Sequence, residues 1–354
     1  MTRNFSERFK SARLLRGYSL QGLADALENK VSRQALHRYE KGEVIPDDNM
    51  LNSIAIALSL PIDYFLRQTI INIEKVEFRK QEQLQVKEQG IIIEQTKEYL
   101  SRYLELEGVT GTTQDFINPL KDSIRTVHSY DEANIAAEKL RELWGLGETP
   151  IPNVIELLEE KNIKIIKIDA DLSFDGLQAI VNGNIPVIAY NAKLSNKQDR
   201  IRFTLLHELA HLMLSHAMSD IPENNKEILC HQFAGAMLLP TKSLKEKLGD
   251  NRTRISIQEL GNIKRQYGIS MQAVVMRAKE CNIINDHYTK QFFFMMKQMN
   301  WRVDEPIDYE GTEESNRFEQ ILFRALAEEV ITVEKAAFFV NQDISEFKKA
   351  HFVL

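Results

Sequence analysis

The spacing of apolar residues along the chain predicts mostly helices, with one short run of strands. In the first sixty-six residues, apolar positions recur three and four residues apart in five short segments, which is the period of an amphipathic helix. The same period returns from residue 131 and dominates after residue 197. Residues 163–168, 177–181 and 185–190 instead have the composition of strands. The expected fold class is therefore mainly α with a small sheet, an α+β organisation.

Turn-forming and polar stretches divide this pattern into four predicted domains. Residues 67–107 are polar, with loosely helical apolar spacing, and we expect long helices interrupted near Gly90. Residues 108–113 predict a loop, Asp175 and Gly176 a turn, and residues 182–184 the turn of a hairpin. The predicted domains are an all-α module at 1–66, a helical connector at 67–129, an α+β domain at 130–284 and a helical C-terminal region at 285–354.

Composition restricts the class of protein. The chain is 43% hydrophobic and 27% charged, which is ordinary for a globular protein. Its apolar runs are shorter than the roughly 18 residues of a membrane span, and its start lacks the apolar core of a signal peptide. The two cysteines, Cys230 and Cys281, are too few for a disulfide framework and are interpreted as ordinary buried thiols. We expect a cytoplasmic protein with no membrane partner.

Charge is distributed unevenly along the chain. The net charge is −6, but residues 1–41 hold nine cations and only four anions, so this segment carries +5 and the remainder −11. An excess of this kind indicates an anionic partner for the basic end.

The basic segment contains the pattern of a helix-turn-helix. Two predicted helices, 20–27 and 33–41, are separated by a short turn and begin after the good N-cap residues Ser19 and Ser32. The exposed face of the second helix carries residues that pair with base edges or phosphates: Arg33, Gln34, His37 and Arg38. A bundle whose polar residues are merely solvated is the alternative interpretation.

Residues 5–66 resemble the XRE-type helix-turn-helix family of phage repressors. The strings YSLQGLADAL and VSRQALHRYEKGEVIP carry the resemblance. It implies that Arg33, Gln34 and Arg38 face base edges of a double-stranded DNA operator, with Ser32 and Lys41 near phosphates. Because one such module offers limited contact area, we expect a homodimer on a two-fold site.

A metal-binding pattern lies on the predicted helix 197–216. The string RFTLLHELAHLMLSH places His207 and His211 four residues apart, so both imidazoles emerge from one helical face, with Glu208 between the two positions. This H-E-x-x-H pattern supplies two zinc ligands and a carboxylate that can deprotonate a bound water. Two histidines and a glutamate on an otherwise apolar helix cost stability unless something binds them.

A catalytic zinc needs a third protein ligand. Glu227 is the strongest candidate, because it lies early on a second predicted helix, 225–239, on a face that is otherwise apolar. The alternative third ligands are His231, His216 and Glu223. Candidates for supporting the ligands or stabilising the oxyanion of the reaction are His231, Arg202 and Tyr190.

These residues match a second family. IRFTLLHELAHLMLSH followed by KEILCHQFAGAMLLP resembles the ImmA/IrrE-type zinc metallo-endopeptidases over residues 130–280, and the C-terminal tail fits more weakly. The resemblance implies a zincin-like, gluzincin-type domain with Zn²⁺ bound by His207, His211 and Glu227, and with Glu208 as the catalytic base. One departure is His231, because the family often has Asn there.

Together the patterns predict a transcriptional regulator with a zinc-dependent peptidase domain that cleaves a partner repressor or the chain itself. One alternative is that the metal domain only senses or binds a partner; another is an antitoxin-like component of a toxin–antitoxin pair. Glu208 favours activity, because zinc binding alone does not need a base there. A second helix-turn-helix over 257–278 is also conceivable, but a packing role is preferred.

Overall fold

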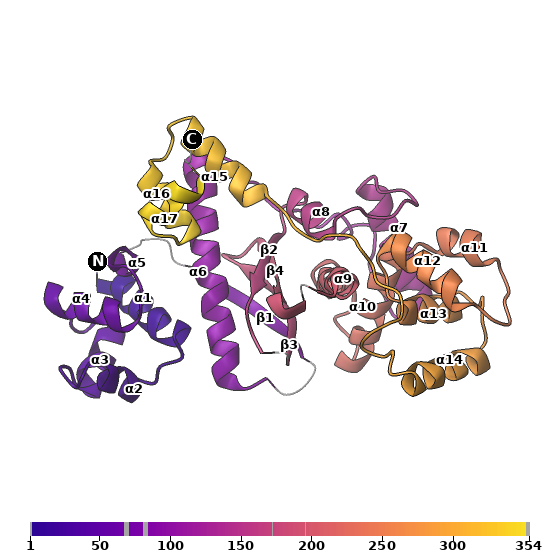
Figure 1. The fold of residues 1–354 in the computed structure, drawn as a ribbon, viewed down its shortest axis with the longest axis horizontal. Coiled ribbons are helices and arrows are strands. Elements are labelled where there is room, and N and C mark those ends of the chain that lie inside the picture. Colours follow the sequence, from indigo (N-terminus) through magenta and orange to yellow (C-terminus); the bar gives the residue numbers. More distant parts are fainter. Residues whose placement is uncertain (1, 67–70, 81–83, 172, 195, 352–354) are drawn as a thin grey trace. The chain divides into compact units, whose positions relative to one another are not determined.

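The computed structural model describes residues 2–66, 71–80, 84–171, 173–194 and 196–351. They form two compact units (Figure 1). The first unit contains residues Met1–Ile73, Lys80–Thr113 and Phe318–Leu354, and the second contains Glu74–Arg79 and Gln114–Arg317. The described residues are mainly helical with one small sheet, as the sequence predicts. None of the described helices is both long and apolar enough to cross a bilayer.

Five short helices form the N-terminal module of the first unit, as predicted. They are α1 (Thr2–Leu15), α2 (Leu20–Ala26), α3 (Arg33–Glu40), α4 (Asp48–Ala57) and α5 (Ile62–Leu66). The hydroxyl of Ser19 accepts a hydrogen bond from the N–H of Gly22 at 2.9 Å, which caps α2, and Ser32 caps α3 through the N–H of Ala35 at 3.2 Å. The helices pack around a core that includes Phe9, Leu23, Leu36, Ile54 and Phe65.

The connector differs from the prediction in two ways. Its first part is a strand, β1 (Ile73–Lys80), and its second part is one helix, α6 (Val86–Thr110), that runs through Gly90 without a break. A glycine inside a helix costs only about 1 kcal/mol. That cost is outweighed because α6 buries Leu100, Tyr103 and Leu106.

The C-terminal helices belong to the same unit as the N-terminal module. They are α15 (Arg317–Ala327), α16 (Val333–Val340) and α17 (Ile344–His351), in the region that the sequence predicted to be helical. Leu106 of α6 lies in one apolar cluster with Leu322, Phe339 and Phe347. Arg102 of α6 donates a hydrogen bond to the carbonyl oxygen of Phe339 at 2.7 Å. The two ends of the chain therefore contribute to one compact unit.

A four-stranded sheet forms one layer of the second unit. Its order is β1-β3-β4-β2, with β2 (Lys164–Ile168), β3 (Phe174–Val181) and β4 (Ile185–Asn191). β3 and β4 form the predicted antiparallel hairpin, and β2 pairs with β4 in parallel. The predicted turn at Asp175 and Gly176 is wrong, because both residues lie within β3 and Gly176 pairs with Tyr190.

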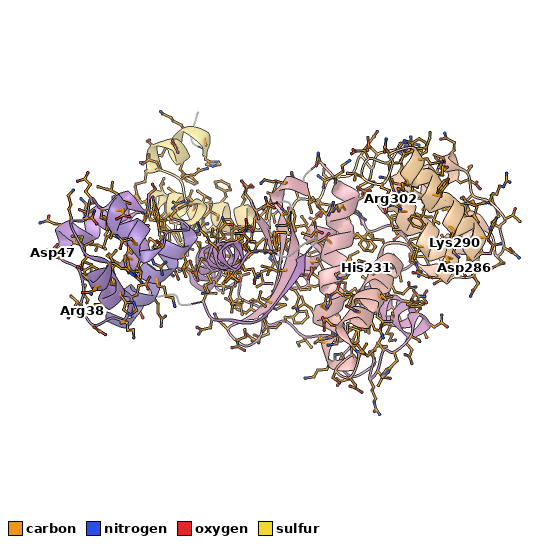
Figure 2. All side chains as sticks on the ribbon, turned by 90° about the horizontal axis from the view of Figure 1, so that it is seen from below. Arg38, Asp47, His231, Asp286, Lys290 and Arg302 are labelled. Atoms are coloured by element: carbon orange, nitrogen blue, oxygen red, sulfur yellow. The ribbon has the colours of Figure 1, made fainter. Side chains whose placement is uncertain are left out.

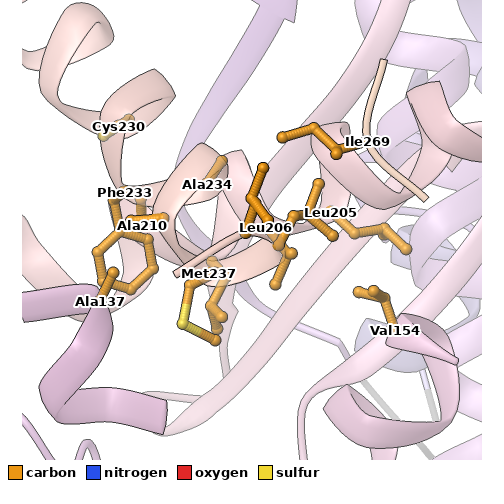
Figure 3. Packing of buried hydrophobic residues seen from close by; sticks show 14 of the residues in the cluster. Ala137, Val154, Leu205, Leu206, Ala210, Cys230, Phe233, Ala234, Met237 and Ile269 are labelled. Atoms are coloured by element: carbon orange, nitrogen blue, oxygen red, sulfur yellow. The ribbon is translucent and has the colours of Figure 1, made fainter. Parts of the chain in front are cut away.

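The described part of the second unit also contains eight α-helices, of which α8 and α9 contact the sheet: α7 (Tyr130–Leu143), α8 (Val154–Glu160), α9 (Gln198–Leu214), α10 (Glu223–Leu238), α11 (Thr241–Leu248), α12 (Ile257–Tyr267), α13 (Met271–Glu280) and α14 (Asp286–Gln298). One face of α9 contacts β3 and β4, and α10 packs against α9 and α7 (Figure 1). Figure 3 shows Phe233 and Met237 of α10 among side chains of α7 and α9. Beyond its first turn α9 is buried on most sides, so its later polar residues, which include His207, Glu208 and His211, lie inside the core.

Candidate metal centre and nucleic-acid interface

Helix α9 places two histidines at one buried point. His207 is 0% and His211 7% exposed, and their Nε2 atoms lie 3.1 Å apart. The four-residue spacing puts them one helical turn apart on the same face, as the sequence predicts. Their rings meet edge to face with centroids 4.9 Å apart.

Glu227 of α10 completes this cluster. Its two carboxylate oxygens lie 3.1 Å from Nε2 of His207 and 3.2 Å from Nε2 of His211. Among the described residues, these three form the one group of His, Cys, Asp and Glu with ligand atoms close enough to share an ion. Ligands of a tetrahedral zinc, each about 2.0–2.1 Å from the metal, lie about 3.3 Å from one another. The donor set and its spacing therefore fit a zinc ion.

The cluster is strongly coupled electrostatically. Hydrogen bonds from His207 and His211 lower the pKa of Glu227 well below its usual value. Burial alone would lower the pKa of His211, but hydrogen bonds with Cys230 and Glu227 outweigh it and raise that pKa to about 11. A cation held by these three residues would replace the proton that His211 shares with Glu227.

Glu208 lies next to the cluster but outside the ligand set. It follows His207 on α9 and is 1% exposed. Strand β3 packs closely against this part of α9 because Gly176 has no side chain: a Cβ there would lie 3.0 Å from Cγ2 of Thr204 and 3.6 Å from Cγ of Glu208. The sheet thus packs against the Glu208 side chain from one side.

His231 lies beside the cluster on α10. Its ring centroid is 4.4 Å from that of His207 and 5.6 Å from that of Phe203, against which it stacks. In contrast to the two α9 histidines, His231 is exposed. His231 therefore lies next to the predicted ligand His207 but is not part of the group formed by His207, His211 and Glu227.

The other candidate ligands lie elsewhere. Nε2 of His216 is 2.9 Å from the carbonyl oxygen of Ile124, and exposed Glu223 pairs with Lys226 at 3.3 Å. Of the alternatives weighed for the third ligand, only His231 is close to the cluster.

Arg202, one candidate for stabilising the oxyanion or supporting the ligands, makes its contacts elsewhere. Its guanidinium is fully buried, pairs with Glu313 and donates to the carbonyl oxygen of Ile151 at 2.7 Å. These partners occupy a different side of α9 from the histidines. Tyr190 is also buried, and burial together with the nearby carboxylates of Glu314 and Glu313 raises its pKa to about 12, so it faces an acidic environment.

Two neighbours of the cluster were not predicted as functional residues. Cys230 is fully buried and hydrogen-bonds to His211. Phe203 supports His231. The signal for both is helical spacing: Cys230 follows Glu227 by three positions and Phe203 precedes His207 by four, so each lies on the face of a predicted ligand.

The predicted DNA-contacting residues of α3 all lie at the surface. Ser32, Arg33, Gln34, His37, Arg38 and Lys41 are exposed, while Leu36 of the same helix is fully buried. Arg38 projects from the module (Figure 2) and lies 3.3 Å from Glu43, a pair that water screens. The helix therefore presents one polar, basic face and one core face.

Part of the basic charge of the module is structural. Arg13 pairs with Glu40 at 2.7 Å and donates to the carbonyl oxygen of Tyr18, while Arg16 donates to the carbonyl oxygens of Leu58 and Ser59. These contacts hold helices together, so Arg13 and Arg16 contribute to the fold as well as to the charge of the module.

Comparison with known proteins identifies two families in the chain. Residues 9–65 match the helix-turn-helix family, and residues 158–279 match the IrrE N-terminal-like domain of the M78 peptidase family. The chain joins a helix-turn-helix module to an IrrE N-terminal-like domain. Both resemblances predicted from the motifs are therefore confirmed. The matched helix-turn-helix segment contains α3, and the matched IrrE N-terminal-like segment contains His207, Glu208, His211 and Glu227.

One curated relative is also similar. It is the SPbeta prophage-derived uncharacterized HTH-type transcriptional regulator YonR of Bacillus subtilis (strain 168), with 37% identity over 65 residues. The similarity covers 18% of this chain and 58% of that protein, so the chain spans less than two thirds of the relative's length.

Proposed function

We propose that the protein is a DNA-binding transcriptional regulator whose second domain is a zinc-dependent peptidase. The observation that carries the peptidase half is the convergence of His207, His211 and Glu227 within 4.8 Å, with Glu208 beside them. The regulator half is supported by the helix-turn-helix match and by the exposed residues of α3.

The DNA-binding step uses the exposed face of α3. Arg33 and Arg38 can donate bidentate hydrogen bonds to guanine, and Gln34 can pair with adenine. Ser32, His37 and Lys41, also exposed, contact phosphates or flanking bases and fix the register of the helix. Two copies of the chain bind one operator, because a single module offers limited area.

The catalytic step uses the buried carboxylate next to the cluster. His207, His211 and Glu227 would hold zinc, which would lower the pKa of a water molecule and polarise the scissile carbonyl. Glu208 takes a proton from the attacking water and delivers it to the leaving nitrogen. Because Glu208 is 1% exposed, bulk water does not compete for its carboxylate.

His231 is the residue positioned to assist this reaction. It is exposed, and its ring lies 4.4 Å from that of His207, so it can donate a hydrogen bond to charge that develops near the metal. The substrate is a protein, either a partner repressor or a copy of this chain, and its cleavage changes expression of the genes under the operator.

The test is Glu208→Gln in the zinc-loaded protein. Gln keeps the size of the side chain but cannot accept the proton, so zinc content and folding persist while cleavage of a randomised dodecapeptide mixture falls by about 10²–10⁴-fold. Exposed Glu223→Gln is the matched control and leaves cleavage unchanged.

The same variant separates a peptidase from a sensor in cells. For a peptidase, Glu208→Gln locks the regulated genes in one state, as His207→Ala does. Normal regulation by Glu208→Gln, combined with loss of regulation by His207→Ala, would contradict the proposal and favour a domain that only senses its metal.

A further inference from the structure

A hollow in the surface adjoins the histidine cluster. Its volume is about 490 Å³, and Phe203 and His231 form part of its wall. His231 stacks on Phe203 at 5.6 Å and lies 4.4 Å from His207, both measured between ring centroids. Only the ring of His231 separates the hollow from His207, a proposed zinc ligand. A side chain next to the scissile bond of a bound polypeptide could therefore reach the hollow.

The open surface of the hollow is mainly apolar. Its lining comes mainly from α7, α9, α10, α13 and α14 and includes Phe203, Ile228, His231, Ala273, Met276 and Phe293. Ile228 is 46% and Met276 38% exposed, which is unusual for large apolar side chains in a concave surface. A concave apolar surface of about 300–1,000 Å³ is typical of a ligand site.

The charged residues of the lining are already engaged within the protein. Arg277 donates to Oδ1 of Asn134 at 2.6 Å and to the carbonyl oxygen of Leu239 at 3.2 Å. Lys279 pairs with Asp286 at 2.7 Å. Glu280 lies 3.8 Å from Arg277. A charged ligand would have to displace these contacts, whereas an apolar group would leave them in place.

A second hollow adjoins the first. It also measures about 490 Å³ and shares Tyr130 and Ile228 with the first, but its other walls include the polar residues His128, Ser129 and Asp220. The two hollows therefore meet at Tyr130 and Ile228. This elongated, two-compartment surface suits an extended polypeptide, with an apolar side chain in the first compartment and polar main chain in the second.

We infer that the hollow lined by Met276, Ala273 and His231 binds a large apolar side chain of the polypeptide substrate, on a residue adjacent to the scissile bond. The inference rests on the proposed peptidase function and specifies its substrate. Leu, Phe, Met or Ile at that residue is favoured over Asp, Glu or Lys, because an apolar side chain in the hollow is removed from water, whereas a charged one would have to displace the contacts of Arg277 and Lys279.

The test maps cleavage sites by mass spectrometry after zinc-loaded protein has digested a randomised dodecapeptide mixture. Wild type prefers a large apolar residue at one position next to the cleaved bond, by about tenfold over a small one. Met276→Glu introduces a charge into the hollow and abolishes the preference. Met299→Glu is the matched control, because Met299 is 52% exposed and lies outside the lining.

A second variant and a binding measurement make the result decisive. Ala273→Phe fills the hollow and shifts the preference toward small residues, which a general loss of stability would not do. The same peptide mixture is also passed over immobilised Glu208→Gln protein, which retains peptides with apolar residues. Protein that carries both Glu208→Gln and Met276→Glu does not retain them.

The outcomes separate this inference from the peptidase proposal. Cleavage with an unchanged preference in both Met276→Glu and Ala273→Phe would overturn the apolar site alone. Capture of apolar peptides that depends on Met276, without any cleavage by wild type, would support the site and overturn the peptidase. A wild-type preference for charged residues at the cleaved bond would contradict the inference directly.

Discussion

Glu227 is the residue that links two helices into one proposed zinc site. Its carboxylate oxygens lie 3.1 and 3.2 Å from the two imidazoles of α9, and its side chain is 43% exposed. It therefore holds the cluster together while leaving room on the solvent side for water and substrate. Without it, two histidines remain, which is fewer than the three protein ligands of catalytic zinc sites.

We predict that Glu227→Ala loses zinc. Purified wild type holds about one zinc per chain, and the variant holds a small fraction of that after dialysis, measured by inductively coupled plasma mass spectrometry. Glu223→Ala is the control, because Glu223 lies one turn earlier on α10, is exposed and pairs with Lys226. Full zinc occupancy in Glu227→Ala would contradict Glu227 as the third ligand and would favour His231 in that role.

The motif residues were predictable from sequence, whereas the roles of Arg202 and Tyr190 were not. His207, Glu208 and His211 lie within one helix, so their geometry follows from helical periodicity. The position of the Arg202 side chain depends instead on its pairing with Glu313. Glu313 is 111 positions away in the sequence and contacts Arg202 only in the folded chain. The pairing of a buried cation with a distant carboxylate leaves no periodic signal.

At the scale of elements, strand β1 shows where periodicity misled. Ile73 and Val76 are three residues apart, which suggested a helix, but the segment pairs with β3 at the edge of the sheet. A strand at an edge gains its hydrogen bonds from a partner far away in sequence, so a short polar segment can be a strand despite its spacing. The hairpin β3–β4 was predictable because its turn and both strands are local.

Helix α3 is the element on which DNA recognition depends. Its core residue Leu36 is fully buried while Arg33 and Arg38 are exposed, so either arginine can be shortened without disturbing the fold. We predict that Arg33→Ala and Arg38→Ala each weaken binding to the preferred operator by about 1–3 kcal/mol and relax the base preference. The measurement is selection from a randomised double-stranded DNA pool, followed by affinity determination at fixed salt.

Lys41→Ala provides the contrast within the same surface. A phosphate contact carries no sequence information, so this variant weakens all DNA sequences to a similar extent and reduces the salt dependence of binding. An operator preference that is the same in wild type, Arg33→Ala and Arg38→Ala would be incompatible with α3 as the recognition helix.

At the scale of the whole molecule, the two ends of the chain stabilise one unit. The C-terminal helices pack on α6, where Tyr103 meets Phe318 with ring centroids 5.3 Å apart and Lys335 pairs with Glu105. Helix α6 also contacts the N-terminal module, because Arg8 of α1 lies 3.5 Å from Glu98 of α6. The sequence predicted a C-terminal region separate from the DNA-binding module, because no local pattern reveals that residues more than 200 positions apart share a core.

This arrangement makes the stability of the first unit depend on the C-terminal helices. Phe339 is fully buried in the cluster with Leu106, so Phe339→Ala removes a large side chain from a packed core and destabilises the first unit by about 3–5 kcal/mol. Ile344→Ala is the control, because Ile344 is 41% exposed on the neighbouring helix. Hydrogen exchange followed by mass spectrometry resolves the effect by region. Phe339→Ala accelerates exchange in α6, α15, α16 and α17 but leaves α9, α10 and the zinc content unchanged, whereas faster exchange in α9 and α10 would mean that the C-terminal helices stabilise the peptidase-family domain instead.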